Sequence, residues 1–564
     1  MRLNVIRNII ICLMLFIAVD LFYLQVIRGG YFAHLSESNS IRVVPIEGAR
    51  GRVYDRNGVI LADNVKAYHA VVVPQDMRDK RALFAFMADV VGVDEKAIEK
   101  RFYKNKTTPF TPVSLAESLT RSQAIRVEEN AFRFPGLMVL EKYSRRYPGA
   151  EYSAHLVGYV GKADPFKVKE IAEYGYTAEE FVGYSGIEQY YDDLLRGNPG
   201  GRQIEVNSRG QQTQLLSVRE PSDGRSLMLT VDEDMQQAAY QALAGRRGAV
   251  VVLDPSNGEV LTLVSSPGYD PNAFLDHDQR DRVAEYLQST LSPLLNRAVS
   301  GAFPPGSVFK IPVAMAGLEE KKIVPATTFD CPGFFQMGDR TYKFPHSWGT
   351  QDLTMALAHS ANEYFFNIGL LLGSPVMAKY ARYFGLGERT GIDLPYESKG
   401  NLPGLNMPRW YKGDTVNMAI GQGYVQATPI QVARLMAGFE NGGILPWPHL
   451  VLSGLDEPFK RQPVHFSFRK DVWDAVHAGL DQVVALDTGT AHALAAIPGT
   501  VTYGKTGTAQ TGPGKEDHAW FAGVTRTDKR VIAYCVFLEH GGSSANAVLL
   551  TKEFLTSLIE QGKI

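Results

Sequence analysis

The sequence predicts an α+β protein with an N-terminal membrane helix, a β-rich middle segment and a C-terminal domain of helices packed on a five-stranded antiparallel sheet. Three observations lead to this prediction. An apolar run of helix length occupies residues 9–27. Short strand patterns separated by turn residues fill residues 28–224. Beyond residue 225, two strand patterns, a mostly helical middle and three further strand patterns follow one another.

The apolar run at residues 9–27 is long enough to cross the hydrocarbon core of a bilayer. Only Asp20 and Gln25 interrupt it. Arg2 and Arg7 precede it, so the positive-inside rule predicts a cytoplasmic N-terminus. The expected location is therefore the cell (inner) membrane, with a single pass and an extracytoplasmic bulk.

Two sequence features bear on whether the N-terminal helix is retained and on how it is accommodated in the membrane. No small-x-small cleavage pattern follows the run, which favours a retained anchor over a cleaved signal sequence, the alternative left open. Asp20 is costly in a lipid-facing helix, so we expect a membrane partner helix to bury it. The predicted division is residues 1–8 cytoplasmic, 9–27 anchor, 28–224 non-catalytic pedestal and 225–564 catalytic domain.

The boundary near residue 225 follows from composition and pattern. Turn-forming residues crowd 196–202 and 220–224, and a strand pattern begins at Leu227. Asp232 then has the position of an N-cap for a helix that runs through Ala244. The strands of the predicted sheet are residues 249–253, 260–264, 505–509, 518–524 and 530–538, and a closing helix covers about 545–561.

Three short motifs lie in one order along the C-terminal domain: Ser307-Val308-Phe309-Lys310, Ser360-Ala361-Asn362 and Lys505-Thr506-Gly507-Thr508. Each alone is weak, since S-x-x-K occurs by chance about twice in a chain of this length at ordinary composition. Together they supply a serine nucleophile, a nearby amine, a hydroxyl–amide pair and a cationic strand. Acyl transfer by an active-site serine without histidine requires this set.

The first motif follows a Pro-Pro-Gly turn, and an apolar helix pattern follows it. Ser307 is therefore expected at a helix N-terminus, with Lys310 on the same face. The helix dipole, burial and the second cation Lys505 all disfavour a charged Lys310 amine. A neutral lysine can take the serine proton, as histidine does in other hydrolases.

The second motif lies between two helix patterns, residues 353–359 and 365–371. Ser360 is expected to relay a proton to the leaving amine, and Asn362 to hold a substrate amide. Capping of the second helix by these side chains is the alternative. His359 is interpreted as a helix-end residue rather than a base.

The third motif begins a strand. Lys505 and the hydroxyls of Thr506 and Thr508 are expected to bind a terminal carboxylate, and Gly507 leaves room for a ligand backbone. The Thr508 N–H can pair with that of Ser307 as an oxyanion hole.

In its Pro-Pro-Gly-Ser-x-Phe-Lys setting, this trio resembles the penicillin-binding proteins and serine β-lactamases. The resemblance extends upstream to the pedestal of the class B penicillin-binding proteins, and is greatest to the elongation-specific penicillin-binding protein 2 type. The pedestal and flanking matches are Arg50-Gly51, 55–58, 61–64, 158–161, 186–188, 195–197, 294–298 and 421–423.

The resemblance implies a penicillin-binding, β-lactamase-like fold and a D,D-transpeptidase or carboxypeptidase that cross-links peptidoglycan stem peptides. It also implies β-lactams as suicide substrates and a SEDS-family glycosyltransferase as membrane partner. A division-specific role is the nearest alternative. A β-lactam sensor would need a cytoplasmic output domain where only about eight residues are expected, and an inactive scaffold would not need an intact trio.

Composition adds exclusions. The net charge of −2, without a long basic run, gives no reason to expect nucleic acid. No cofactor is expected. Cys535 lies in a probable core strand, which favours a buried thiol over a disulfide. Zinc near Cys331 and His346 is disfavoured, because their spacing is loose and Ala361 cannot be a ligand. Glu397, in an E-x-x-x-N pattern, matches the deacylating residue of some β-lactamases, but is interpreted as part of a turn.

Overall fold

The structure is a computed structural model of the chain. It describes residues 2–31, 41–46, 48–106, 109, 111–163, 181–206, 212–276, 279–403, 409–455 and 461–564. Residue contacts divide the chain into two compact units. The first comprises residues 1–50, 64–144 and 196–224, and the second comprises 51–63, 145–195 and 225–564.

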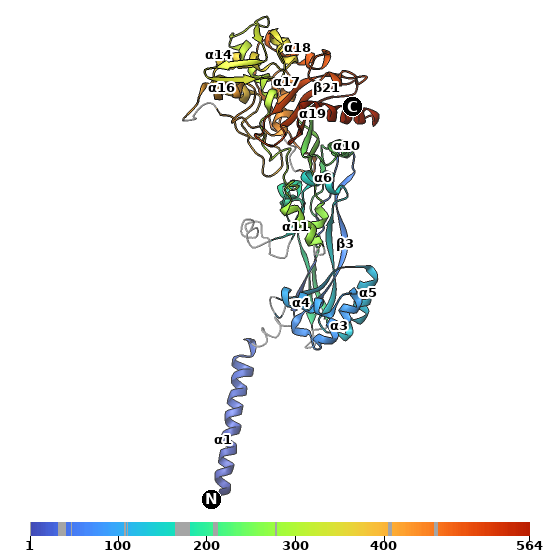
Figure 1. Cartoon of the computed structure of the whole chain (residues 1–564). Helices are drawn as coiled ribbons and strands as arrows, with labels where there is room; N and C mark the ends of the chain where they lie inside the picture. The colour runs from blue at the N-terminus through green and yellow to red at the C-terminus, as the bar shows by residue number, and fades with distance from the viewer. Residues whose placement is uncertain are drawn as a thin grey trace. The chain divides into compact units, whose positions relative to one another are not determined.

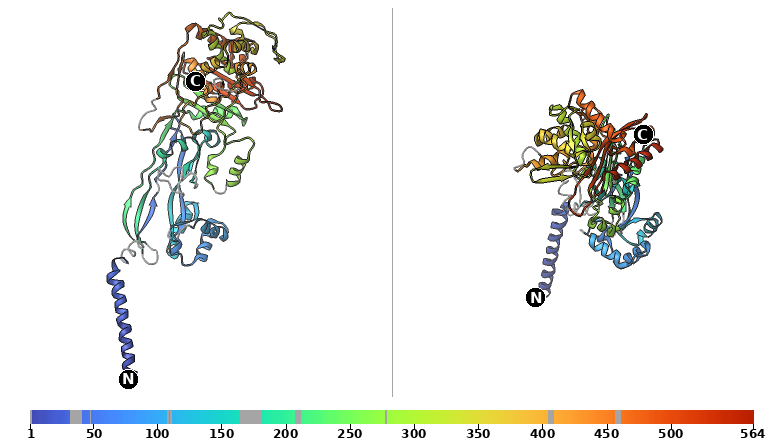
Figure 2. Two further views of the ribbon diagram at one scale, coloured as in Figure 1. Left: turned by 90° about the vertical axis from the view of Figure 1, so that its left-hand side faces the viewer. Right: turned by 45° about the horizontal axis from the view of Figure 1, so that its top comes forward.

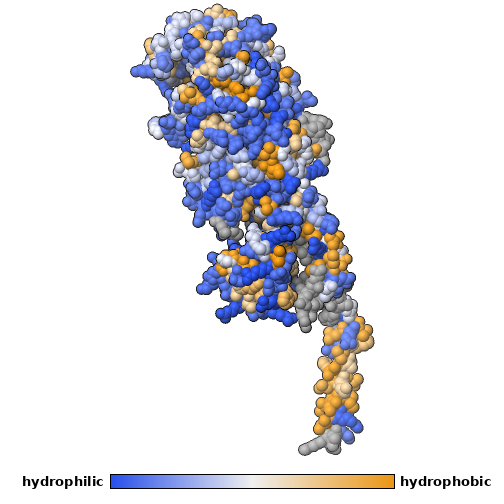
Figure 3. Space-filling model, turned by 90° about the vertical axis from the view of Figure 1, so that its right-hand side faces the viewer, coloured by the Kyte–Doolittle hydropathy of each residue, from blue (hydrophilic) through white to orange (hydrophobic). Residues whose placement is uncertain are grey.

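The N-terminal apolar helix predicted from the sequence is confirmed. Helix α1 (Arg2–Phe22) continues as a π-helical turn at Tyr23–Ile27. The stretch Asn4–Ile27 is long and apolar enough to cross a membrane, and its most apolar part is fully exposed. Figure 3 shows hydrophobic residues over most of the surface of this helix. Its length and composition are consistent with a single-pass anchor.

The first unit combines antiparallel strands with three short helices. Asp79 and Asp94 cap two of the helices by accepting hydrogen bonds from backbone N–H groups one turn on. Phe84 and Phe102 pack their rings 5.4 Å apart in the core between helices and sheet. Its elements are β1 (Ile41–Ile46), most of β3 (Ile60–Val72), α3 (Lys80–Val91), α4 (Glu95–Asn105), β4 (Val113–Leu119), α5 (Arg121–Asn130), most of β5 (Leu137–Arg146), β8 (Gly200–Val206) and β9 (Gln212–Arg219).

The second unit is built on the predicted five-stranded antiparallel sheet, which is confirmed, in the order β12-β11-β22-β21-β20. Strand β20 forms one edge, and in its register Lys505 lies opposite Ala522 and Gly507 opposite Trp520. The strands are β11 (Gly248–Leu253), β12 (Val260–Ser266), β20 (Val501–Ala509), β21 (His518–Arg526) and β22 (Val531–Leu538).

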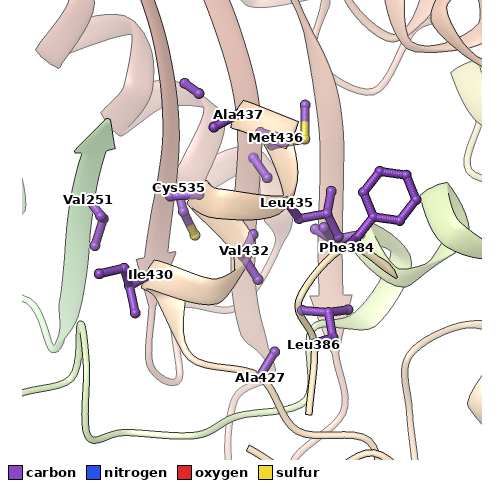
Figure 4. Packing of buried hydrophobic residues seen from close by; sticks show 14 of the residues in the cluster. Val251, Phe384, Leu386, Ala427, Ile430, Val432, Leu435, Met436, Ala437 and Cys535 are labelled. Carbon is purple, nitrogen blue, oxygen red and sulfur yellow. The ribbon is translucent and has the colours of Figure 1, made fainter. Parts of the chain in front are cut away.

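Both faces of this sheet are covered by helices (Figures 1 and 2). Val251 and Cys535 belong to the cluster that contains helix α17 (Pro429–Glu440), as Figure 4 shows. Their strand neighbours Val250 and Val536 point to the other face, where α10 (Glu233–Leu243) and α19 (Ser544–Glu560) pack. This alternation is the period of two expected for a strand. As predicted, Asp232 caps α10 and Cys535 is buried.

Helix α12 (Lys310–Glu319) is buried over its first nine residues. The remaining helices of the second unit are α6 (Ala150–Val157), α8 (Gly186–Tyr190), α9 (Asp192–Leu195), α11 (Arg280–Gln288), α13 (Leu353–Ala358), α14 (Asn362–Leu372), α15 (Ser374–Tyr383), α16 (Lys412–Ala419) and α18 (Lys470–Ala485). Among them, α12 packs against α14, α15 and α18. The short strands are β2 (Val53–Tyr54), β6 (Val160–Lys162), β7 (Phe181–Gly183), β10 (Leu227–Leu229), β13 (Phe329–Cys331), β14 (Phe334–Met337), β15 (Arg340–Lys343), β16 (Gly349–Gln351), β17 (Ile444–Leu445), β18 (Val451–Ser453) and β19 (Val464–His465).

One of the boundaries between the two compact units falls between Gly224 and Arg225, where the sequence predicts a domain boundary. Residues 51–63 nevertheless belong to the second unit. Asp55 explains part of this, because its buried carboxylate accepts a hydrogen bond of 3.1 Å from the Glu233 N–H at the start of α10. The four-part division of the chain remains a prediction.

Candidate active site

Ser307 lies in a 3-10 turn, Gly306–Phe309, that leads directly into α12. The sequence predicted an α-helix beginning at this serine, whereas the α-helix begins at Lys310. Pro312 accounts for the difference, because it has no N–H to donate to the carbonyl of Val308. The first turn therefore tightens, and Ser307 remains half-buried rather than enclosed.

Glycines allow the Ser307 turn to pack directly on two backbones. Gly306 has φ +56°, and a Cβ atom built on it would lie 2.7 Å from the carbonyl oxygen of Thr508. A Cβ on Gly507 would lie 2.7 Å from that of Pro305. The carbonyl oxygen of Gly421 accepts a hydrogen bond of 3.1 Å from the Gly306 N–H. Gly507, assigned from sequence to ligand approach, is thus needed for the turn to contact β20.

The Lys310 side chain is completely buried and reaches the second motif. Its Nζ donates hydrogen bonds to Ser360 O at 2.7 Å and Asn362 Oδ1 at 2.7 Å, and lies 3.2 Å from Ser360 Oγ. A neutral amine has two N–H groups and one lone pair. The two N–H groups can make the two 2.7 Å hydrogen bonds, to Ser360 O and Asn362 Oδ1. The lone pair can accept a hydrogen bond from the Ser360 hydroxyl.

Burial is the main reason why the pKa of Lys310 lies well below its usual value of 10.5, and the nearby charge of Lys505 lowers it further. Glu363 acts in the opposite direction, but its carboxylate accepts a hydrogen bond of 2.9 Å from the Gly333 N–H. Lys310 is therefore suited to accept a proton near pH 7.

Ser360 and Asn362 connect helices α13 and α14. Ser360 has φ +57°, a left-handed conformation that a residue with a side chain adopts at a cost of about 1–3 kcal/mol. Asn362 is the first residue of α14, the N-cap is Ala361, and no side chain caps this end. The capping alternative therefore does not describe this helix start. Both side chains are instead within hydrogen-bonding distance of Lys310.

The third motif lies on the edge strand β20. Lys505 is completely buried, which lowers its pKa from 10.5 to about 7. Its Nζ donates to the Thr506 carbonyl at 3.3 Å. Thr508 is exposed, and its carbonyl accepts a hydrogen bond of 3.4 Å from Gln422 Nε2. Below about pH 7 Lys505 is therefore a buried cation on this strand, and in that form it can bind a carboxylate strongly.

The structure brings all eight predicted residues into one region. Lys310, Ser360 and Asn362 are joined by hydrogen bonds, and Lys505 is close enough to Lys310 to affect its pKa. The Ser307 turn contacts β20 at the fourth residue of the third motif. The arrangement suits acyl transfer, because Ser307 lies three residues before a buried amine of lowered pKa and its turn packs on the strand that carries Lys505.

The structure describes the surroundings of the residues on which three alternative interpretations depended. His359 ends α13, as predicted, and both ring nitrogens are occupied. Glu397 accepts hydrogen bonds from the backbone of Thr390 and Gly391, which is a structural role within a turn. Cys331 is buried, and within the described ranges no three His, Cys, Asp or Glu residues are arranged to hold a metal ion.

Sequence reasoning did not find Thr488 and Thr490, in the loop after α18. Thr488 Oγ1 is 2.8 Å from His359 Nε2, and Thr490 Oγ1 is 2.8 Å from Thr506 Oγ1. The only signal in the sequence was a Thr-Gly-Thr turn pattern after a helix, which is common in loops of any function.

Comparisons with known proteins identify the family of the chain. Residues 248–559 match the penicillin-binding protein transpeptidase domain, and residues 45–229 match the penicillin-binding protein dimerisation domain. The peptidoglycan D,D-transpeptidase MrdA of Haemophilus influenzae is 31% identical, over 96% of this chain and 89% of the relative. The protein of the same name from Escherichia coli K12 is 32% identical, over 96% and 91%.

Solved structures are similar over nearly the whole chain. Helicobacter pylori PBP2, in a complex with MreC, is 28% identical with a TM-score of 0.82, covering 93% of this chain and 99% of that one. A chain from a peptidoglycan synthase complex, in a study of coordinated polymerisation and crosslinking, is 30% identical with a TM-score of 0.73, covering 99% and 98%.

Fold and site together define an active-site serine acyltransferase of the penicillin-binding class. The chain belongs to the class B penicillin-binding proteins, with a dimerisation domain and a transpeptidase domain, and its named relatives are of the MrdA and PBP2 type.

Proposed function

We propose that this chain cross-links peptidoglycan through an acyl-enzyme on Ser307 during cell-wall elongation. As a class B member with MrdA relatives over 96% of its length, it is a serine-type, penicillin-binding D,D-transpeptidase of the elongation-specific type. The observation that supports the residue assignment is the buried Lys310, whose Nζ has short contacts only to the second motif among the hydrogen bonds of the described chain.

In the first step, Ser307 Oγ attacks the carbonyl carbon of the penultimate D-alanine of a stem peptide. Lys310 accepts the hydroxyl proton, and Ser360 carries a proton to the leaving amine. The bond to the terminal D-alanine breaks, and that residue departs as the free amino acid. The Ser307 and Thr508 N–H groups are proposed to stabilise the negative charge on the carbonyl oxygen.

In the second step, an amine from a neighbouring stem attacks the Ser307 ester. The amine loses a proton to Lys310, the proton is returned to Ser307 Oγ as the ester bond breaks, and the new amide is the cross-link. Attack by water in place of the amine would release a shortened stem peptide. We propose this D,D-carboxypeptidase reaction as a side activity of the same acyl-enzyme.

Substrate recognition is assigned to the other motif residues. Lys505, with the Thr506 and Thr508 hydroxyls, would bind the terminal carboxylate, and Asn362 a backbone amide of the stem, with Gly507 keeping β20 close to the Ser307 turn. Penicillins carry a carboxylate and a strained amide that fit the same positions. Acylation by them would block Ser307.

The location and partners follow from the N-terminal helix and from relatives. We propose a single-pass anchor in the cell inner membrane with a cytoplasmic N-terminus and a periplasmic catalytic domain. A peptidoglycan polymerase of the SEDS family is the proposed membrane partner, in line with the synthase complex that contains a similar chain. MreC is a further candidate, because the similar Helicobacter pylori protein was solved with it.

Depletion of the protein tests this function in cells. We expect depleted cells to become round, and wild-type protein but not Ser307→Ala to restore their shape. Filamentation instead of rounding would assign the chain to division. Restoration of shape by Ser307→Ala would show that the protein acts as an inactive scaffold, and would overturn the proposed chemistry.

A further inference from the structure

A loop after helix α18 contacts the two residues that directly precede the second motif, and it also contacts the third motif. The loop comprises residues 487–490, and all its contacts described below lie within the second unit. The Thr490 N–H donates a hydrogen bond of 3.2 Å to the carbonyl of Ala358, at the end of α13. The Thr490 hydroxyl lies 2.8 Å from that of Thr506 on β20. One residue therefore connects the helix before Ser360 to the strand that carries Lys505.

His359 provides the second connection. Its ring stacks on Trp348, with centroids 4.1 Å apart and planes 3° from parallel. Its Nδ1 is 2.8 Å from Gln351 Oε1, and its Nε2 is 2.8 Å from Thr488 Oγ1. Ser360 follows His359 directly, so the orientation of this ring is transmitted to the backbone of the second motif.

The hydrogen bonds around Gln351 define the tautomer of His359. Gln351 Nε2 donates to the carbonyls of Trp348 at 2.8 Å and Thr350 at 3.2 Å, so its Oε1 is the atom that faces the imidazole. An oxygen acceptor requires a proton on Nδ1. Nε2 therefore accepts from the Thr488 hydroxyl, and burial lowers the pKa of His359 and favours this neutral form.

A similar argument applies to Thr506. Its hydroxyl has one proton, which is needed to hydrogen-bond a substrate carboxylate. That proton is available to substrate only when the partner hydroxyl of Thr490 donates to Thr506 Oγ1. Thr490 therefore orients the Thr506 hydroxyl without touching substrate itself.

We propose that His359 and Thr490 are positioning residues, which use the 487–490 loop to hold Ser360 and the Lys505 strand in place relative to each other. The contact of Thr490 with the Lys505 strand and the contact of the loop with His359 are expected to affect different steps. Loss of the Thr490 hydroxyl should affect carboxylate binding, whereas loss of the His359 hydrogen bonds should affect the step that uses Ser360 and Lys310. The proposal rests on acylation of Ser307 as described above.

The test measures acylation of the full-length, detergent-solubilised protein by a fluorescent penicillin, separating the binding constant from the acylation rate constant. Thr490→Val keeps the shape of the side chain and removes its hydroxyl. We expect it to weaken binding about tenfold, as for a lost hydrogen bond to a charged ligand site, with the acylation rate constant nearly unchanged. Thr490→Ser restores the hydroxyl and should recover binding to within about threefold of wild type.

A matched control lies on the same strand. The Thr502 and Thr525 hydroxyls are 2.9 Å apart on β20 and β21, a similar pair away from the three motifs. Thr502→Val should leave both constants unchanged. A penicillin methyl ester, which lacks the carboxylate, should react equally with wild type and Thr490→Val.

The other end is tested with His359→Phe, which keeps the aromatic stack and removes both nitrogens. We expect the acylation rate constant to fall about tenfold or more, with binding nearly unchanged. Thr488→Val removes only the hydrogen bond to Nε2 and should give a smaller fall in the acylation rate constant, with binding nearly unchanged. It replaces His359→Phe as the test if that variant does not fold.

Different results would contradict the proposed function and the proposed positioning role. If wild type fails to be labelled at Ser307, the proposed function is wrong. If wild type is labelled but Thr490→Val and Thr488→Val, folded with normal melting temperatures, acylate like wild type, the positioning role is wrong. It is also wrong if Thr490→Ser is as impaired as Thr490→Val.

Discussion

The Lys310 amine donates a hydrogen bond of 2.7 Å to the Asn362 side-chain carbonyl, across 52 positions of the sequence. This contact joins the first motif to the second through a lysine side chain that is completely buried. Burial of this amine lowers its pKa and so favours the neutral form, and two short hydrogen bonds set the direction of the side chain. The burial that lowers the pKa of Lys310, and so suits it to the proposed role of base, should also make the position intolerant of a permanently charged replacement.

Lys310→Arg should lower the rate of acylation by penicillin by at least the ~10²-fold typical of losing a general base, because guanidinium stays protonated in proteins. Lys505→Arg keeps the positive charge of the third motif. It should weaken binding of the carboxylate but retain more of the acylation rate. Stopped-flow acylation of both variants provides the measurement, and near-wild-type acylation by Lys310→Arg would mean that the base lies elsewhere, with Ser360 next to test.

The second-order rate constant of acylation should depend on pH with a fall on the alkaline side near pH 7. Lys505, with a pKa of about 7, loses its charge as pH rises through this value and then no longer attracts the carboxylate. On the acid side the rate should fall where Lys310 becomes protonated, at a pH well below 10.5. A pH series of acylation rates on wild type measures both limbs.

Lys505→Arg is the control for the alkaline limb. Arginine stays charged through this range, so the fall near pH 7 should disappear while the acid limb remains. Persistence of the same alkaline fall in Lys505→Arg would show that another group is responsible.

Glu397→Gln should lower thermal stability and leave the lifetime of the penicilloyl-enzyme unchanged. The Glu397 carboxylate accepts hydrogen bonds from Thr390 N and Oγ1 at 2.5 and 2.6 Å and from Gly391 N at 3.0 Å. A glutamine directs an N–H₂ group at one of these donors, at a cost of about 1–3 kcal/mol. Thermal unfolding and the decay of labelled enzyme measure the two effects, and a longer-lived adduct would indicate that Glu397 activates water.

The anchor has its own test. If residues 9–27 are retained and span the bilayer, the protein should remain in the membrane after carbonate extraction. Protease added to the periplasmic side should digest its bulk. N-terminal sequencing that finds a mature protein beginning after residue 27 would contradict the retained anchor.

The sheet and the order of the motifs were predictable because their signals are local. Strand periodicity in β11 and β22, the Asp232 cap of α10 and the proline-rich turn before Ser307 each lie within a few residues of the structure that they specify. The predicted end of the helix at residue 359 was accurate for the same reason.

The contacts that make the site work were not predictable in this way. The reach of Lys310 to Asn362, and the contact of Thr490 with Thr506, depend on how helices pack, which no short pattern encodes. The tightened turn at Ser307 was missed because the effect of Pro312 on the preceding carbonyl was not considered. Gly507 was assigned to the approach of a ligand backbone, and only the structure shows that it accommodates the backbone of the Ser307 turn.

The central claim is that Ser307 is the nucleophile. Peptide mapping by mass spectrometry after reaction with penicillin measures this directly. We predict one penicilloyl adduct, on Ser307, and no adduct on folded Ser307→Ala. An adduct on any other serine, or labelling of Ser307→Ala at the wild-type rate, would contradict the claim.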